Sequence, residues 1–183
     1  MPFKAERSLN PVEKEDPQQA DLSDSRLVRL LAYWREGMAK AGGKLPPMTA
    51  INPVELRFIL GWLMIMEPLD GGADFKYRLF GTEIASIQQR DLTGCKVSDS
   101  FPNFAKWTCE VYRKVIARRA PLLTYHSPQR YVAVDRWERL ILPYVDDKDA
   151  VTRLLVGAVI TRKIPGAEDT GLPWPLRDFG KEV

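Results

Sequence analysis

The sequence predicts an α+β domain: an antiparallel five-stranded sheet with short helices, one long helix and an N-terminal amphipathic helix. Three observations lead to this class. Two strand-like segments around a Gly-Gly turn come first, helical patterns occupy the middle of the chain, and three strand-like segments follow. Strands that succeed one another through short turns pair in the antiparallel sense, so the whole sheet is expected to be antiparallel.

The composition is that of an ordinary globular protein with one domain and some extensions. Of 183 residues, 45% are hydrophobic, and 27 basic against 24 acidic residues give a net charge of +3. This mixed balance argues against nucleic acid as a partner. No apolar run approaches the roughly 18 residues that a membrane span needs. We therefore expect no membrane partner and a cytoplasmic location, with Cys95 and Cys109 as free thiols.

Residues 1–20 are polar, charged and interrupted by proline. Such a segment buries too little apolar surface to offset the entropy lost on ordering. We expect it to be disordered or loosely attached, and removal of residues 1–18 to leave the melting temperature nearly unchanged.

Residues 21–60 are expected to form a helical extension. Apolar side chains recur at helical spacing within Leu22–Lys40 and form one face of a helix, made of Leu27, Leu30, Leu31, Trp34 and Met38. Two interpretations are open: this face covers the domain's own sheet, or it packs against a second copy of the chain. Because tryptophan is enriched at interface hot spots, we predict a homodimer in which this helix takes part.

The predicted domain proper spans residues 61–163. A second short helix, expected at Pro53–Leu60 with Asn52 as its N-cap, precedes it. A hairpin follows, with strands at Leu63–Glu67 and Phe75–Phe80.

Helical patterns dominate the middle of the chain. Thr82 begins a short helix with Ile84 and Ile87 on one edge, and Asn103–Arg119 has the broad apolar face of a long helix. The remaining strands are predicted at Leu122–Ser127, at Tyr131–Val134 continuing into Trp137–Val145, and at Thr152–Arg162. Residues 164–183 form a tail rich in proline and glycine, whose Trp174 is expected to dock on the domain or on a partner.

The segment YRLFGTEIASIQQRDLTG, residues 77–94, resembles the first half of a PAS domain, in the variant common in stand-alone bacterial proteins. With the order of the later elements, the resemblance covers about residues 60 to 163. It implies a PAS fold and a sensory or regulatory role. The family's usual glycine before Arg-Asp is Gln89 here, so the resemblance implies a helix exit that differs in detail.

Two groups of side chains are candidate site residues. Arg78 and Asp91 match positions that recur in this variant, and we expect them to form a structural pair or to contact an anionic ligand. Six further residues lie on elements that flank the cavity of a PAS domain, with core packing as the alternative role for the aromatic ones: Tyr77, Phe80, Trp107, Tyr112, His126 and Trp137.

The sequence identifies neither a cofactor nor a metal site. His126 is the single histidine, and it has no cysteine or aspartate at ligand spacing. The resemblance also argues against haem, because haem-binding PAS proteins usually take their axial histidine from the long helix. The residues around Cys95 do not match the motif of flavin-binding light sensors.

The leading hypothesis is a sensory or regulatory module that binds a small molecule or a protein partner and signals by association, without catalytic output. The alternative is a small α+β enzyme of the cone or hot-dog type acting on an apolar substrate, and a third reading is a dimerising adaptor with a filled core. An enzyme should place a carboxylate or His126 at the bottom of a pocket, with a perturbed pKa.

Overall fold

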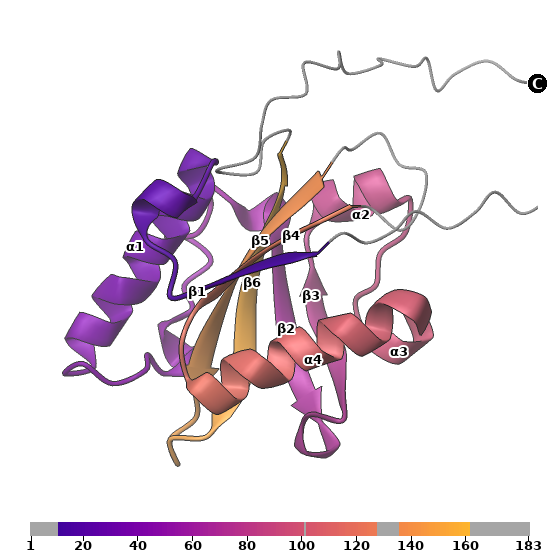
Figure 1. The fold of residues 1–183 in the computed structure, drawn as a ribbon. Helices are drawn as coiled ribbons and strands as arrows, with labels where there is room; N and C mark the ends of the chain where they lie inside the picture. The colour runs from indigo at the N-terminus through magenta and orange to yellow at the C-terminus, as the bar shows by residue number, and fades with distance from the viewer. Residues whose placement is uncertain (1–10, 101, 128–135, 162–183) are drawn as a thin grey trace, which may run out of the picture.

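The computed structural model describes residues 11–100, 102–127 and 136–161. They form one antiparallel sheet with the strand order β1-β4-β5-β6-β2-β3 (Figure 1). The strands are β1 (Val12–Glu15), β2 (Leu63–Leu69), β3 (Asp74–Phe80), β4 (Leu122–His126), β5 (Arg136–Val145) and β6 (Val151–Thr161). The helices are α1 (Ser25–Lys40), α2 (Thr82–Gln88), α3 (Val97–Ser100) and α4 (Pro102–Arg118). The predicted α+β class is thus confirmed, whereas the predicted strand at residues 131–134 and the tail at 164–183 lie outside the described residues.

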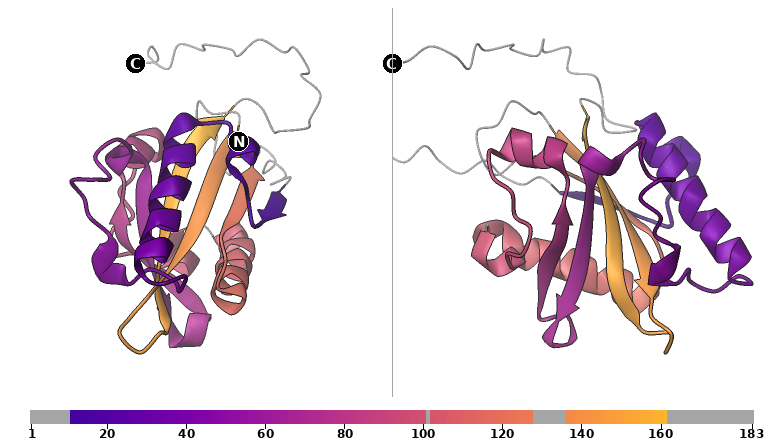
Figure 2. Two further views of the ribbon diagram at one scale, coloured as in Figure 1. Left: turned by 90° about the vertical axis from the view of Figure 1, so that its left-hand side faces the viewer. Right: turned by 180° about the vertical axis from the view of Figure 1, so that it is seen from behind.

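Helices cover both faces of the sheet. Helix α1 lies against one face, and α2, α3 and α4 lie on the opposite side (Figures 1 and 2). The central strands β5 and β6 therefore have both faces buried, which explains why both strands are apolar along most of their length.

Helix α1 packs on its own sheet. Its N-cap is Asp24, whose side chain accepts a hydrogen bond from the Arg26 backbone N–H. The apolar face is buried against residues of β4, β5 and β6 that include Leu123, Leu140, Leu155 and Val159. Of the two interpretations left open by the sequence, the structure supports packing within the monomer. The homodimer stays a prediction, but this face is not available to form it.

Close approach of α1 depends on a glycine in β6. A Cβ atom at Gly157 would lie 2.6 Å from Leu30 Cδ2 and 2.7 Å from Leu27 Cδ2. Any side chain at this position would push the helix away from the sheet or force both leucines into new rotamers.

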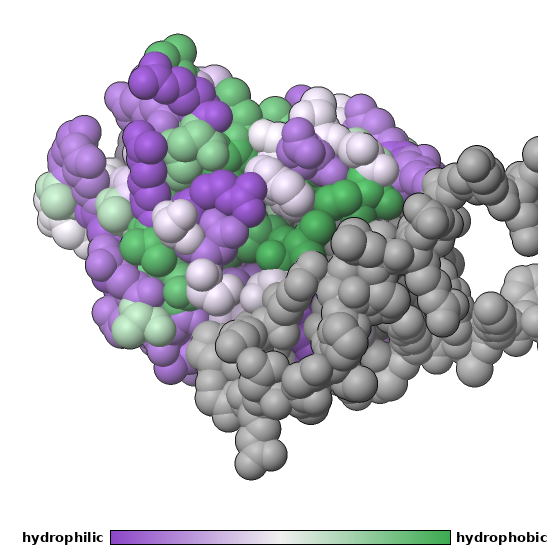
Figure 3. Space-filling view, turned by 90° about the horizontal axis from the view of Figure 1, so that it is seen from above, coloured by the Kyte–Doolittle hydropathy of each residue, from purple (hydrophilic) through white to green (hydrophobic). Residues whose placement is uncertain are grey.

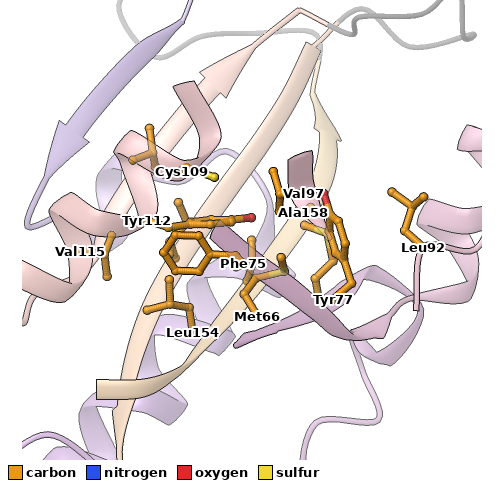
Figure 4. Close-up of a cluster of buried hydrophobic side chains, with 14 of the residues drawn as sticks. Met66, Phe75, Tyr77, Leu92, Val97, Cys109, Tyr112, Val115, Leu154 and Ala158 are labelled. Carbon is orange, nitrogen blue, oxygen red and sulfur yellow. The ribbon is translucent and has the colours of Figure 1, made fainter. Parts of the chain in front are cut away.

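The second core lies between the opposite face of the sheet and α2, α3 and α4. In its centre the rings of Phe75 and Tyr112 meet edge to face, with centroids 5.0 Å apart. Figure 4 shows this pair beside Met66 and Leu154, with Tyr77 and Leu92 toward the α2 end of the cluster.

Residues 12–15 form a strand, so this part of the segment expected to be disordered or loosely attached is ordered; residues 1–10 lie outside the described residues. Strand β1 pairs antiparallel with β4 and covers an edge of the sheet. All four of its side chains are exposed. Two of them contact α4, where Lys114 pairs with Glu13 and Arg118 Nη1 lies 3.0 Å from Glu15 Oε2. The sheet therefore has six strands rather than five.

The prediction of a helix at Pro53–Leu60 is also wrong. Asn52 Oδ1 accepts from the Val54 N–H, and Asn52 O accepts from the Leu56 N–H, but these residues form successive turns instead of a helix. A local Asx turn satisfies the same backbone N–H donors that a helix N-cap would satisfy. Asn52 before Pro53 therefore did not distinguish a turn from the start of a helix. Short 3-10 helices occur at Gln19–Asp21, Met48–Ala50, Leu60–Trp62 and Asp70–Gly72.

Seen from above, apolar side chains form a patch that is bordered by hydrophilic ones (Figure 3). The exposed large apolar residues belong to different elements: Val12, Met48, Val54, Leu60 and Leu79. None of the described helices is both long enough and apolar enough to cross a membrane.

Candidate functional site

A small cavity of about 50 Å³ lies between the sheet and helices α2 and α4. Its lining comes from the sheet, from α2 and from the residues around α2 and α4: Met64, Tyr77, Phe80, Ile84, Gln88, Leu92, Phe104, His126, Trp137, Arg139 and Ala158. This volume is below the roughly 300–1,000 Å³ of drug-sized ligand sites and above the roughly 10–15 Å³ that one water needs. As it stands, the cavity fits a group of a few heavy atoms.

The register of the sheet places the polar lining residues. In the pairing of β4 with β5, His126 lies opposite Trp137 and Thr124 lies opposite Arg139. Side chains two apart along a strand share a face, so all four point to the α4 side. On the other side of β5, Arg139 lies opposite Ala158 of β6, whose methyl group leaves room beside the guanidinium.

Arg139 is the most unusual residue of this site. It is 3% exposed, and its guanidinium lies 4.9 Å from the ring centroid of Trp107, with Phe104 and Tyr112 also within cation–π distance. Its Nε donates to Thr124 Oγ1 at 3.3 Å, whereas its Nη2 has no hydrogen-bond partner. Burial lowers the pKa of this guanidinium, but an arginine retains its charge in proteins. Among the described residues, no carboxylate lies within ion-pair distance of it.

His126 is a buried neutral imidazole. Its ring lies 5.1 Å from that of Phe104 and 5.2 Å from that of Trp107, and its Nδ1 has no hydrogen-bond partner. Desolvation, and then the charge of Arg139, hold its pKa well below the usual range. The imidazole is therefore uncharged near neutral pH.

The structure brings the six predicted cavity residues together in one region. Tyr77, Phe80, His126 and Trp137 line the cavity. Trp107 and Tyr112 do not, but both contact the Arg139 guanidinium through their rings. Burial raises the pKa of the Tyr112 hydroxyl, which also lacks a partner.

The predicted pair of Arg78 and Asp91 does not form. Arg78 Nε lies 3.6 Å from Glu67 Oε2, across the β2–β3 hairpin. Asp91 accepts from the Thr93 backbone N–H at 2.8 Å, and that bond lowers the pKa of its carboxyl. Asp91 thus closes its own turn. Both residues have local partners, and neither lines the cavity.

Sequence reasoning missed Arg139. The signal was present, because Trp137, Arg139 and Ile141 alternate in a strand and must share a face. An arginine between two large apolar residues of that face points to a buried cation.

A larger hollow, about 520 Å³, lies on the outer side of α1, between Arg29, Glu36, Glu55 and Phe58. Its charges are mixed and exposed, and Lys40 and Glu36 at its border already form an ion pair at 2.8 Å. We place the candidate site in the smaller cavity because buried polar atoms without partners occur there.

The sequence was compared with known proteins. A family model for the PAS domain matches residues 23–160. The chain belongs to the PAS domain family. Neither the curated proteins nor the solved structures gave a match. The resemblance found in residues 77–94 is thereby confirmed, and the matched span also includes α1, whereas β1 precedes it.

Within this PAS domain, the cavity combines a few polar groups with an apolar wall. Among the described residues there is no group of three or more His, Cys, Asp or Glu side chains placed to hold a metal ion. The cavity has one cation, one neutral imidazole and one amide in an otherwise largely apolar and aromatic lining. That set can bind and orient a small molecule.

Proposed function

We propose that the protein is a sensory or regulatory PAS module of the cytoplasm that binds a small molecule in the cavity beside Arg139. The observation behind this proposal is the combination of a cavity with buried polar atoms that have no partner among the described residues. Such atoms are costly to bury, and a ligand with complementary polar groups would satisfy them. Family membership supports a sensory role in general terms.

The signal would pass by association, either with a second copy of the chain or with another protein. Because the apolar face of α1 is buried on the sheet, a homodimer would use other surfaces. Ligand-dependent association can be measured by light scattering with and without the bound compound.

One observation favours the alternative that the protein is an enzyme. His126 lines the cavity, and its pKa is lowered. A general base also needs a partner that orients it and a pKa near the working pH. Among the described residues the Nδ1 of His126 has no such partner, and desolvation holds its pKa well below the usual range. Binding without catalysis is the better fit.

The proposal is tested by filling the cavity. Ala158→Leu adds three carbon atoms to its wall, whereas Ala32→Leu adds the same atoms to the larger hollow on α1. We expect compounds found by native mass spectrometry or a thermal-shift screen to bind wild type and Ala32→Leu but not a folded Ala158→Leu. Binding lost in Ala32→Leu instead would place the ligand site at α1 and contradict the proposal.

A further inference from the structure

The charge balance inside the cavity is incomplete. Arg139 brings a positive charge to its wall, and none of the described lining residues is acidic. The preceding residue, Glu138, does not neutralise it, because neighbouring residues in a strand point to opposite faces of the sheet. Glu138 lies on the α1 side, where it accepts hydrogen bonds from the Ser23 backbone N–H at 3.0 Å and from the Ser23 hydroxyl.

Protein groups satisfy the guanidinium only in part. Three aromatic rings and Thr124 Oγ1 surround it, but ring faces offset only a fraction of the cost of desolvating a cation. Nη2 still lacks an acceptor. A planar guanidinium with free N–H donors matches the two oxygens of a carboxylate.

The rest of the cavity limits the size and polarity of the ligand. Phe80, Ile84 and Leu92 are apolar, and the volume of about 50 Å³ accepts only a few heavy atoms. A phosphate group carries more charge than one guanidinium balances, and the described lining residues include no second cation. A carboxylate with a short apolar body meets each of these conditions.

We propose that the cavity takes a small monocarboxylate, with its carboxylate on Arg139 and its apolar end toward Phe80, Ile84 and Leu92. This inference rests on the proposed function and adds the chemical class of the ligand. Among the described residues no carboxylate pairs with Arg139, and the ligand would supply that counter-ion.

The test uses propionate, with propionamide as the uncharged compound of the same shape and inorganic phosphate as another anion. Binding is measured by titration calorimetry and by the rise in melting temperature, in buffers free of carboxylates. We expect wild type to bind propionate and not propionamide. Arg139→Met and Arg139→Gln should weaken binding about 10- to 100-fold, the range for a hydrogen bond to a charged group. Arg78→Met removes an exposed arginine of β3 and should leave binding unchanged.

A second measurement does not depend on the ligand. A guanidinium with no counter-ion costs the free protein stability, so Arg139→Met should melt at or above the wild-type temperature without ligand. A fall of more than about 5 °C, which is more than 1 kcal/mol for a chain of this size, would show that contacts within the protein outweigh the cost of burying the charge. That result would overturn the proposal.

The remaining outcomes separate this inference from the proposed function. Propionamide binding as tightly as propionate, unchanged binding in both Arg139 variants, or tighter binding of phosphate would overturn the carboxylate assignment alone. If neither these anions nor neutral compounds bind in the cavity of wild type, the proposed function fails as well.

Discussion

Two oppositely charged residues, adjacent in β5, are buried on opposite faces of the sheet and differ in their partners. Glu138 accepts hydrogen bonds from Ser23, and the Tyr125 hydroxyl lies 3.4 Å from its carboxylate. Burial nevertheless raises the pKa of Glu138. Among the described residues, the one hydrogen bond of the Arg139 side chain runs from Nε to Thr124 Oγ1. The contrast suggests that Glu138 anchors the segment before α1, whereas Arg139 is available to a ligand.

His126 should make stability depend on pH. The unfolded chain takes up a proton on this imidazole as pH falls through about 6.5, whereas the buried ring stays neutral far below that value. Wild type should therefore lose stability between pH 6.5 and 5 relative to His126→Phe, by up to about 1.4 kcal/mol per pH unit. The measurement is the free energy of unfolding in urea at several pH values.

The comparison with His126→Phe is needed because Glu138 acts in the opposite direction. Its raised pKa means that the folded protein takes up a proton before the unfolded chain does as pH falls, which stabilises the fold. The chain has no other histidine, so a difference between the two proteins in this window reports on His126. Parallel curves would show that the folded imidazole titrates normally.

Gln89 occupies a conformation that suits glycine. It follows α2 with φ 52° and ψ 31°, in the left-handed region. Only glycine adopts that region without a steric cost. We expect Gln89→Gly to raise the free energy of unfolding by about 0.5–1 kcal/mol, measured by urea denaturation.

The neighbouring residue provides the control for this prediction. Gln88 is the last residue of α2, and Gln88→Gly should lower the free energy of unfolding by up to about 1 kcal/mol. Equal effects of the two substitutions would mean that the left-handed exit of α2 is not strained.

At the scale of elements, the contact between α1 and β6 sets the stability of one core. Leu30→Ala should lower the free energy of unfolding by about 2–5 kcal/mol, because it leaves a cavity against the sheet. Gly157→Ala alone should lower it by about 1–3 kcal/mol through overpacking. Together they should cost less than the sum, since the new methyl group occupies space that Leu30 vacates.

Glu36→Ala, on the exposed side of α1, is the matched control and should change stability by no more than about 0.5 kcal/mol. The double variant Leu30→Glu, Trp34→Glu should unfold, because both side chains are buried in the monomer. A folded double variant with native circular dichroism would contradict the observed packing of α1.

Sequence patterns predicted the elements that have their own periodicity. The hairpin β2–β3, helix α4 and the later strands are near their predicted bounds because alternation and helical spacing are local properties. What α1 packs against was not predictable, since an apolar stripe does not specify what covers it. Strand β1 was missed because its sequence VEKE has no buried side chain, and it exists by pairing with β4.

The sequence predicted only part of the candidate site, because the rest depends on how the elements pair. The aromatic residues were visible as large side chains on the right elements, and four of the six line the cavity. Arg139 depends on the register between β4 and β5, and the partners of Arg78 and Asp91 depend on the hairpin and turn geometry. Register and turn type are set by the assembled fold rather than by composition.

At the scale of the whole molecule, β1 completes the sheet. We expect removal of residues 1–18 to lower the melting temperature relative to removal of residues 1–10, because only the longer deletion removes β1 and its ion pairs with α4. Each kcal/mol lost should lower the melting temperature by about 2–4 °C. The measurement is calorimetry of both truncated proteins.

The longer deletion also exposes the edge of β4, and unpaired edges promote association. Light scattering should therefore show larger species for the longer deletion. Identical melting temperatures and masses for the two truncated proteins would show that β1 adds nothing to the fold.

The position of α1 also has a consequence while the chain is being synthesised on the ribosome. Its apolar face leaves the exit tunnel early, but β5 and β6, which cover that face, are among the last described elements to emerge. At about 5 to 20 residues per second, the delay is on the order of ten seconds. During this time the nascent chain exposes Leu27, Leu30, Leu31 and Trp34 with no sheet to receive them. The newly synthesised chain thus has an uncovered apolar helix face until the last strands of the sheet are translated.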